Sequence, residues 1–517
     1  MRSIRLRILI TCVVLAIVGV GGWQLLPSDD GQQKAIKVGT TDQVTSLDPA
    51  GAYDAGSWAL FGNVYQSLMT FKPSSSTPVP DAARKCSFTD STLKVYRCQL
   101  RDDITFANGH KMTAEDVKYS IDRVVGIKDE LGPSSLFTTL KSIQADGDTV
   151  TFNLVSQDVT FPMKIATGAA AIVDHTTYPV DGLRKDNLVD GSGPYVLKTY
   201  TPGKAARLEP NPTYHGAIED TGEPVSISYF ADSEALAAAW KAKKVDVTDR
   251  QLPPSVIAGL DSASDELRMN EADSAEIRNL VFNTRKTSPM SNAAVRRAVA
   301  AVIDRPKIVT DVYDSTVDPL YSLIPQGIAS HTTAFFDEYP KPSPALAKSL
   351  LANAGIQTPV SFTLAHAKGG SALPEANELR EQLEATGLFK VKIVEKDWKP
   401  FQEGYAKGEF DAYAVGWVPD FPDPDNFIQP LIGANSTLHN GYKDPAVDAL
   451  IKSTQQYSER ARASADFKAL QKVVAKDVPL LPLWQKKNYV LSSVDVTGSQ
   501  YLSDGTGIWR LWELNWV

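Results

Sequence analysis

Three aspartates are concentrated in the stretch GWVPDFPDPDNF, which runs from Gly416 to Phe427. Asp420, Asp423 and Asp425 could hold a metal ion, form an acid/base pair, bind a cation or build a turn. A calcium loop needs a central glycine and a distant glutamate, and the stretch has neither. A glycosidase would need a second acid on the opposite wall of a cleft, which the sequence alone does not reveal.

Asp420 has the most distinctive surroundings of the three acids. It lies between Trp417 and Phe421 and follows the predicted strand FDAYAVGW, and Trp398 is expected to close the strand before that one. A lone carboxylate among aromatic rings suits the capture of a cationic group. The alternative for each acid is a solvated side chain in a proline-rich turn. We therefore expect Asp420 to bind a ligand cation and the two later acids to build the turn.

Motifs for catalysis or metal binding are missing from the rest of the sequence. There is no Walker A motif, no G-x-G-x-x-G after a strand, no H-E-x-x-H and no G-x-S-x-G. The histidines are scattered without a pair at metal-binding spacing. Gly191–Pro194 reads as a turn, because Pro194 would break the helix that follows a nucleophile elbow. We expect no enzyme activity, no cofactor and no metal; an extracellular hydrolase that uses acidic residues is the alternative.

Cys86 and Cys98 frame the segment CSFTDSTLKVYRC, which is predicted to form a strand, a turn near Thr89–Ser91 and a second strand. A cross-strand disulfide would close this hairpin and stabilise it by roughly 3 kcal/mol. The alternative is two separate buried thiols. Disulfides persist in oxidising compartments, so a paired state predicts a location outside the cytoplasm.

Residues 1–27 are predicted to be a membrane anchor or a signal segment. Arg2, Arg5 and Arg7 precede the uncharged run Ile8–Leu26. Nineteen helical residues span roughly 30 Å, about one hydrocarbon core. A positive flank keeps the N-terminal end in the cytoplasm. A cleaved secretory peptide is the alternative to an anchor, and both place the functional part outside the cytoplasmic membrane, at the cell surface or in the periplasmic space.

Length and charge narrow the class of protein further. A chain of 517 residues is too long for one hydrophobic core, so two or three domains are expected. The composition, 43% hydrophobic and 22% charged, is that of a globular protein. A net charge of -8 argues against a nucleic-acid partner, because phosphate binding needs a basic surface.

The hydrophobic patterns divide the chain into two blocks that mix helices and strands. The first, to about residue 270, includes the strand at Ala35–Thr40 and the helix MTAEDVKYSIDRVV, whose expected N-cap is Thr113. The second includes the strands VSFTLAHA, KVKIVEKDW and FDAYAVGW. The tryptophan-rich C-terminus is expected to pack back on the first block. The chain would then cross between lobes at least twice, which suits a hinge that closes on a ligand.

Seven stretches, taken in order, resemble the extracellular solute-binding proteins of family 5, the peptide/nickel-type receptors of bacterial ABC importers. They are SLDP with NVYQSLMTF, QLRDDITFANGHKMTAEDVKYSIDRV, GSGPYVL with LEPNPTYHG, LVFNTRKTSPMSNAAVRRAVAAVIDRPKI, AKSLLANAG, GEFDAYAVGWVPDFPDPDNF and NGYKDPAVDALI. The resemblance covers the chain from about residue 36 to its end. It implies an α/β, periplasmic-binding-protein-like two-lobe hinge fold of class II, or cluster C, with an extra subdomain in lobe 1.

The expected domains follow from the resemblance and the patterns together. They are an anchor or signal segment at 1–27, a linker at 28–35, lobe 1 at 36–265 plus 485–517 with an inserted subdomain at about 71–188, and lobe 2 at 266–484.

The resemblance also implies roles for residues in and around the acidic stretch. In peptide-binding members, the acid three positions after the tryptophan of the GW pair binds the N-terminal ammonium of the peptide, and that position is Asp420 here. Trp417 and Trp398 match two tryptophans that line side-chain pockets. Further ligand contacts are expected at Gly416, Val418, Gln43 and Val44.

The sequence departs from the family pattern where some oligopeptide receptors place arginines for the carboxylate of the ligand. Tyr405 and Ala414 stand at the corresponding positions. His366, Lys368 and Arg285 are the basic candidates instead, and each has a surface or structural role as its alternative. This departure from the family pattern favours a dipeptide or another cationic solute over an oligopeptide as the ligand.

The expected function is therefore an extracytoplasmic receptor, present as a monomer. It would capture di- or oligopeptides between two lobes and deliver them to the permease of an ABC transporter, while its N-terminal segment meets the membrane. Alternatives are the same fold with a nickel chelate, an oligosaccharide or an opine, or a peptide sensor without a permease. A buried ion pair at Asp420 would fix the position of the ligand, because an unpaired buried charge costs several kcal/mol.

Overall fold

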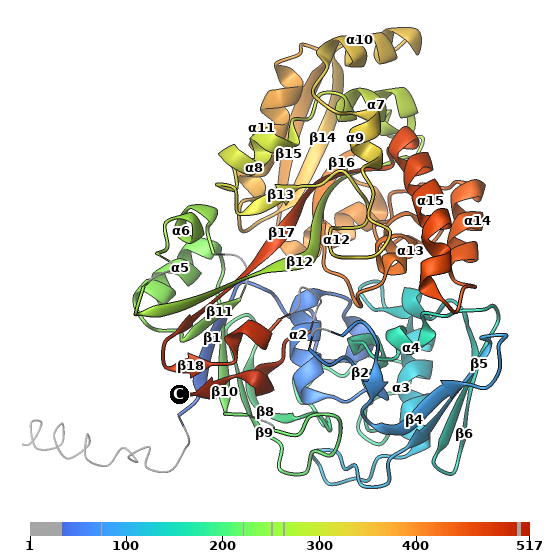
Figure 1. Cartoon of the computed structure of the whole chain (residues 1–517), viewed down its shortest axis with the longest axis vertical. Coiled ribbons are helices and arrows are strands. Elements are labelled where there is room, and N and C mark those ends of the chain that lie inside the picture. Colours follow the sequence, from blue (N-terminus) through green and yellow to red (C-terminus); the bar gives the residue numbers. More distant parts are fainter. Residues whose placement is uncertain (1–33, 74, 221, 250–251, 262–263, 504–507) are drawn as a thin grey trace, which may run out of the picture. The chain divides into compact units, whose positions relative to one another are not determined.

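The computed structural model describes residues 34–517 except 74, 221, 250–251, 262–263 and 504–507. Residues 36–517 form one compact unit (Figure 1), and Lys34 and Ala35 belong to a separate N-terminal unit. The predicted anchor at 1–27 and nearly all of the predicted linker lie outside the described residues. Within the described part, no helix is both long and apolar enough to cross a membrane.

One sheet of eleven strands runs through the described part of the chain, in the order β15-β14-β16-β12-β17-β11-β1-β10-β9-β8, with β13 beside β17. Its strands are β1 (Ile36–Thr40), β8 (Tyr195–Thr201), β9 (Ala205–Pro210), β10 (Val225–Tyr229), β11 (Val247–Asp249), β12 (Leu267–Phe282), β13 (Val317–Pro319), β14 (Val360–Ala367), β15 (Phe389–Lys396), β16 (Ala412–Trp417) and β17 (Leu480–Ser493).

The antiparallel pair β12 and β17 connects the two halves of this sheet. At one end Leu267 pairs with Ser493, near β11, and at the other Val281 pairs with Leu480, near β16. The register of the pair shifts between residues 273 and 277 and again between 278 and 279. Each of the two long strands passes from one half of the sheet to the other, so β12 and β17 form two of the expected crossings.

A smaller sheet contains β4 (Ala83–Phe88), β5 (Val95–Leu100), β6 (Leu140–Asp146) and β7 (Thr149–Leu154) in the order β4-β5-β7-β6. Cys86 and Cys98 lie opposite each other on β4 and β5 and form a disulfide, which confirms the predicted pairing. Two short ladders complete the strands, β2 (Met69–Thr70) with β3 (Val79–Pro80) and β18 (Val496–Thr497) with β19 (Asn515–Trp516).

The helices pack around these sheets (Figure 1). They are α2 (Ala55–Val64), α3 (Ala114–Ile127), α4 (Phe161–Lys164), α5 (Ser233–Lys241), α6 (Pro254–Ala258), α7 (Ala293–Ala300), α8 (Arg305–Asp311), α9 (Ala334–Glu338), α10 (Pro344–Asn353), α11 (Ala372–Glu384), α12 (Trp398–Lys407), α13 (Gln429–Ile432), α14 (Pro445–Thr454) and α15 (Ser464–Asp477). The predicted cap of α3 is confirmed, since Thr113 and Asp116 form a capping box. Trp398 corrects the prediction: it begins α12 instead of closing a strand, because β15 ends at Lys396.

Two large hydrophobic cores lie on either side of the strand crossing. Residues of the second core run from Ile277 to Trp484. The first core is built from residues up to Val247, from Val490 onward, and from Phe421; the C-terminal tryptophans Trp509 and Trp512 belong to it. The expected return of the C-terminus to the first block is therefore confirmed. The boundaries drawn above for the lobes and the inserted subdomain remain predictions.

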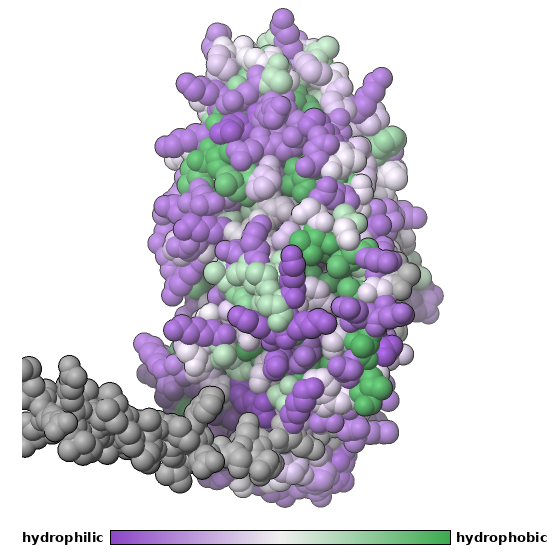
Figure 2. Space-filling view, turned by 90° about the vertical axis from the view of Figure 1, so that its left-hand side faces the viewer, coloured by the Kyte–Doolittle hydropathy of each residue, from purple (hydrophilic) through white to green (hydrophobic). Residues whose placement is uncertain are grey.

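The face drawn in Figure 2 has no concentration of apolar residues like that of the two cores. On that face, hydrophobic residues occur in small groups separated by hydrophilic ones. In the described part of the chain, most large apolar side chains are buried in the cores.

Replacing Cys86 and Cys98 by alanine should destabilise the small sheet. The disulfide closes a loop with a sequence separation of 12, and a loop of this size contributes about 3 kcal/mol. Thermal unfolding should begin several degrees lower in the double variant than in the wild type. Adding a reductant should lower the wild-type midpoint and leave the variant unchanged; an equal response of both proteins would contradict the assignment.

Candidate functional site

A cavity of about 840 Å³ lies among α2, the end of β16 and the central strands β12 and β17. Its volume falls within the range of about 300–1,000 Å³ that is common for ligand sites. All seven residues predicted to contact a ligand line it. They are Gln43, Val44, Trp398, Gly416, Trp417, Val418 and Asp420. The structure thus brings together residues that lie more than 350 positions apart in the sequence.

Asp420 is held at the cavity by two neighbours that the sequence analysis did not identify. Its Oδ2 accepts a hydrogen bond from the Tyr53 hydroxyl at 2.7 Å and another from Asn426 Nδ2 at 2.8 Å. The backbone N–H of Asp420 donates in return to Asn426 Oδ1 at 2.8 Å. The carboxylate therefore has a fixed orientation, and its two hydrogen bonds fall on one oxygen.

The electrostatic setting of Asp420 is that of a buried acid without a cation. The residue is 5% exposed. Burial raises the pKa of its carboxyl to about 7, and the hydrogen bonds from Asn426 and Tyr53 lower that pKa only in part. In the part of the chain that the structure describes, no basic side chain forms an ion pair with Asp420, and its Oδ1 accepts no hydrogen bond. The site is thus prepared for a positively charged donor.

Aromatic rings form the wall beside this carboxylate. Tyr53 stacks on Trp58 with 5.2 Å between ring centroids, and the edge-on contact between Tyr53 and Trp417 measures 6.0 Å. Among the described atoms, the buried Nε1 of Trp417 has no hydrogen-bond partner. Asp420 thus has an aromatic wall beside it, and low polarity strengthens any charge interaction there.

Phe421, the residue after Asp420, anchors the chain on that side of the carboxylate. It is 1% exposed and belongs to the first core, whereas Trp417 packs against the second. The short segment between them therefore passes from one core to the other. Because both ends are anchored by packing, Asp420 is placed where the two cores meet the cavity.

Asp423 and Asp425 are not the solvated turn residues that one interpretation of the sequence predicted. Asp423 does build the turn, since its side chain caps the 3-10 helix at Pro424–Phe427. Both side chains are buried, however. Asp423 forms two hydrogen bonds with Arg460, at 2.8 and 2.6 Å. Burial raises the pKa of Asp425 to about 6. Neither lines the large cavity.

The three basic candidates for a ligand carboxylate have different positions. Lys368 lines the cavity, but its ammonium is exposed and pairs with Asp397 at 3.0 Å. His366 is buried outside the lining. Arg285 also lies outside the lining and donates to the backbone carbonyl of Ala406 at 3.2 Å. Tyr405, one of the departures from the family pattern, lines the cavity and stacks on Tyr413.

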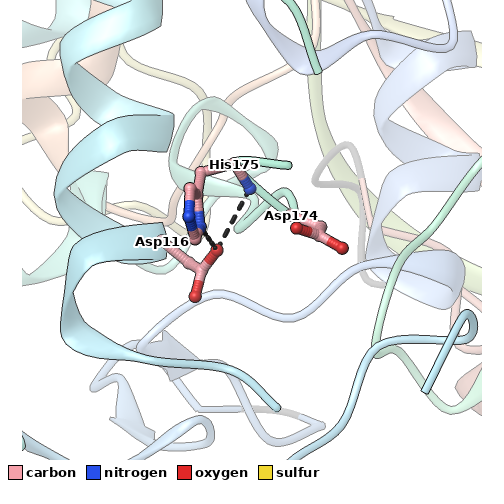
Figure 3. A group of neighbouring side chains, drawn as sticks. All are labelled: Asp116, Asp174 and His175. Atoms are coloured by element: carbon pink, nitrogen blue, oxygen red, sulfur yellow. Dashed lines mark hydrogen bonds and ion pairs between the residues drawn. The ribbon is translucent and has the colours of Figure 1, made fainter. Parts of the chain in front are cut away.

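A separate group of potential metal ligands is formed by Asp116, Asp174 and His175, which do not line the cavity (Figure 3). Asp116 accepts the N–H of Thr113 at 2.8 Å and lies 2.7 Å from His175 Nδ1. The hydrogen bond to Asp116 raises the pKa of His175. Asp174 accepts the backbone N–H of Thr176 at 2.8 Å. Asp116 thus stabilises the start of a helix, and Asp174 stabilises a turn.

Comparison with known proteins gives consistent matches over most of the chain. Residues 77–437 match the family described as "Bacterial extracellular solute-binding proteins, family 5 Middle". The "Probable D,D-dipeptide-binding periplasmic protein DdpA" of Escherichia coli is 25% identical over 515 residues, which cover 96% of each chain.

Two solved structures illustrate the likeness in fold. A Helicobacter pylori periplasmic binding protein, DppA, solved with the peptide STSA, has a TM-score of 0.83 at 20% identity and covers 93% of this chain and 98% of its own. AgaA of A. tumefaciens, solved with agropinic acid, has a TM-score of 0.84 at 19% identity, with coverage of 94% and 99%. The expected α/β two-lobe fold of the periplasmic-binding-protein type is confirmed.

Asp420→Asn should alter the pH dependence of stability in the ligand-free protein. The pKa of Asp420 is about 7 in the folded protein and has its ordinary value of 3.8 in the unfolded chain. Between these two pH values the folded state therefore binds one proton that the unfolded state has lost. The stability that this group contributes is complete below pH 3.8 and is lost as the pH rises through 7.

Between pH 5 and pH 8 the wild type should therefore lose roughly 2–3 kcal/mol relative to Asp420→Asn, whose amide oxygen can still accept from Tyr53 and Asn426. Denaturant unfolding at the two pH values measures this difference. If the variant and the wild type differ equally at both, Asp420 does not titrate as described.

Proposed function

The chain belongs to the bacterial extracellular solute-binding proteins of family 5, and from this premise we propose that it captures short peptides in the cavity beside Asp420. In this proposal it acts as a receptor and not as an enzyme, and it passes its ligand to the permease of an ABC transporter. The similarity to peptide-binding relatives supports the ligand class.

The observation that carries this proposal is the uncompensated carboxylate of Asp420. A peptide α-ammonium supplies a positive charge and three N–H donors, and the Oδ1 of Asp420 has no donor among the described residues. An ammonium there would offset the cost of ionising a buried acid. The aromatic side chains of Tyr53, Trp58 and Trp417 would surround the ion pair and exclude water from it.

The edge of β16 supports a strand-like mode for the peptide backbone. β14 pairs with β16 only at Ala412 and Tyr413. On that side, the following residues Val415–Val418 line the cavity without a partner strand among the described ones. An extended peptide can bind such an edge through its own N–H and C=O groups. This mode tolerates different side chains, which the wide cavity can accommodate together with water.

The remaining expectations belong to the same proposal. The N-terminal segment, cleaved or retained, would direct the protein across the cytoplasmic membrane, and a retained segment would tether it there. Closure of the two lobes on a ligand would present a surface that the permease recognises, so that conformation reports occupancy. We propose a monomer, because each chain contains its own cavity. A peptide sensor without a permease would use the same site. A neutral oligosaccharide would not, because it carries no cation to pair with Asp420.

Ligand-free protein should be stabilised against heat by peptides of two to six residues, because a ligand that binds only the folded state raises the melting temperature. Oligosaccharides and a nickel–histidine chelate serve as the comparison set in the same thermal-shift measurement. A shift with either of these and none with peptides would refute the peptide assignment.

Asp420→Asn should weaken the binding of a free tripeptide by about 100-fold or more, since removing one partner of a buried ion pair costs about 3–5 kcal/mol. N-acetylation of the tripeptide should cost the wild type a similar amount. Combining both changes should add little, because they remove the same interaction. Isothermal titration calorimetry measures all four affinities.

The matched control is Asp397→Asn, which removes a carboxylate that lines the cavity but is largely exposed. Its affinity should stay close to that of the wild type. Full affinity in Asp420→Asn, or equal binding of the acetylated peptide by the wild type, would remove Asp420 from the site.

Peptide affinity should also depend on pH with a maximum slightly above neutral. The ion pair needs an ionised Asp420, whose pKa is about 7 in the empty site, and a protonated amine, whose pKa is about 8. Affinity should thus fall toward tenfold per unit as the pH drops below 7.

Calorimetry at pH 6 in buffers of different ionisation enthalpy should detect the release of nearly one proton per bound peptide, and Asp420→Asn should abolish that release. A constant affinity from pH 5 to 7.5 would be incompatible with this pairing.

A further inference from the structure

Arg278 lies on the cavity wall and has N–H groups available for a ligand. It belongs to β12, where it pairs with Gly416 of β16 and Trp484 of β17, and it lines the cavity. Its Nε donates to Glu375 Oε1 at 2.8 Å. In the described part of the chain, its two terminal amino groups make no hydrogen bond. A guanidinium binds a carboxylate best through two parallel N–H groups, and Arg278 has them available.

Glu375 holds this guanidinium in place. It is fully buried at the start of α11, and both of its carboxylate oxygens accept hydrogen bonds. Its Oε2 accepts from the Tyr313 hydroxyl at 2.8 Å and from Trp484 Nε1 at 2.7 Å. Three donors, from β12, from β17 and from the segment between α8 and β13, thus fix the carboxylate, and through it the plane of Arg278. The side chain of Arg278 is pre-organised instead of mobile, which lowers the entropy lost on binding.

The charge of Arg278 is maintained although the side chain is mostly covered. Burial acts to lower its pKa, but the neighbouring Glu375 raises it, and the net direction is upward. The nearby cation Lys486 is engaged differently, since it pairs with Glu276 at 3.2 Å. The positive end of α11, at Gly369–Ala372, lines the same cavity and adds to a potential that favours an anion.

The position of Arg278 relative to Asp420 suits a short ligand. Arg278 lies directly across from Gly416, and Asp420 is four residues further along the chain. Four residues span at most roughly 14 Å. An extended peptide advances about 3.4 Å per residue, so a peptide of up to about four residues spans this length of β16. Arg278 and Asp420 line the same cavity, so one bound peptide would reach both charges.

We propose that Arg278 binds the terminal carboxylate of this ligand, so that the site selects free peptides of two to four residues by both of their charged ends. The inference rests on the proposed function, because it assigns the far end of a peptide whose amine is at Asp420. It supplies the carboxylate partner that Tyr405 and Ala414 cannot provide.

The test compares trialanine with its C-terminal amide by calorimetry. The wild type should bind the free acid about 10- to 100-fold more tightly than the amide, because a charge-assisted bidentate interaction is lost. Arg278→Gln should bind both forms with nearly equal affinity. A second variant, Arg278→Gln with Glu375→Gln, avoids leaving Glu375 buried without its cation and should also lose the discrimination.

Lys399→Gln is the matched control, since it removes an exposed cation that lines the same cavity, and it should discriminate like the wild type. Equal binding of acid and amide by the wild type would overturn the role of Arg278 and leave peptide capture standing. Discrimination that persists in both Arg278 variants would overturn it too. If neither trialanine nor its amide binds the wild type, the proposed function fails, and this inference fails with it.

A length series gives an independent readout. The ratio of acid to amide affinity should be large for peptides of two to four alanines and should approach one for six, whose carboxylate would pass beyond Arg278. A ratio that is the same for two and six alanines would refute the assignment.

Discussion

The burial of an uncompensated carboxylate is the constraint on which the site depends. Asp420 is 5% exposed, and its two hydrogen-bond donors, Tyr53 and Asn426, are neutral. Two neutral donors are too weak to keep a buried acid fully ionised, so its pKa rises to about 7. The empty site therefore holds part of its population as the neutral acid near physiological pH. A cation that enters gains the full charge interaction in a poorly hydrated setting, which favours ligands with an ammonium group over neutral solutes of similar size.

The fold places this acid by anchoring the chain on either side of it. Phe421 is buried in the first core, and Trp417 packs against the second. The strands β12 and β17 cross between the same two cores, and the register of the pair shifts around residues 273–279. Arg278 lies in this crossing, so the proposed carboxylate partner and the ammonium partner both sit where the two lobes join. A peptide held at both ends would contact residues attached to each core, which gives a physical reason for the lobes to close on it.

The sequence predicted those parts of the site that a local pattern carries. The aromatic neighbours of Asp420 and the strand before it favoured a cation site, and Cys86 and Cys98 indicated a cross-strand bond. Partners distant in the sequence could not be found in this way: Tyr53 reaches Asp420 across 367 positions, and Arg460 reaches Asp423 across 37. The same limit explains why the burial of Asp423 and Asp425 was not predicted and why Trp398 was expected at the end of a strand. Arg278 did leave a signal, a charged residue within the stretch IRNLVF, but its contact with Glu375 across 97 positions could not be found from the sequence.

The central claim is that a peptide lies with its amine at Asp420 and its carboxylate at Arg278. The most direct measurement is a crystal structure of the protein with bound trialanine. The account predicts the terminal nitrogen at about 2.7–3.2 Å from Asp420 Oδ1 and the terminal carboxylate within the same range of the Arg278 amino groups. A peptide bound in the opposite direction, or outside the cavity that these two residues line, would contradict it.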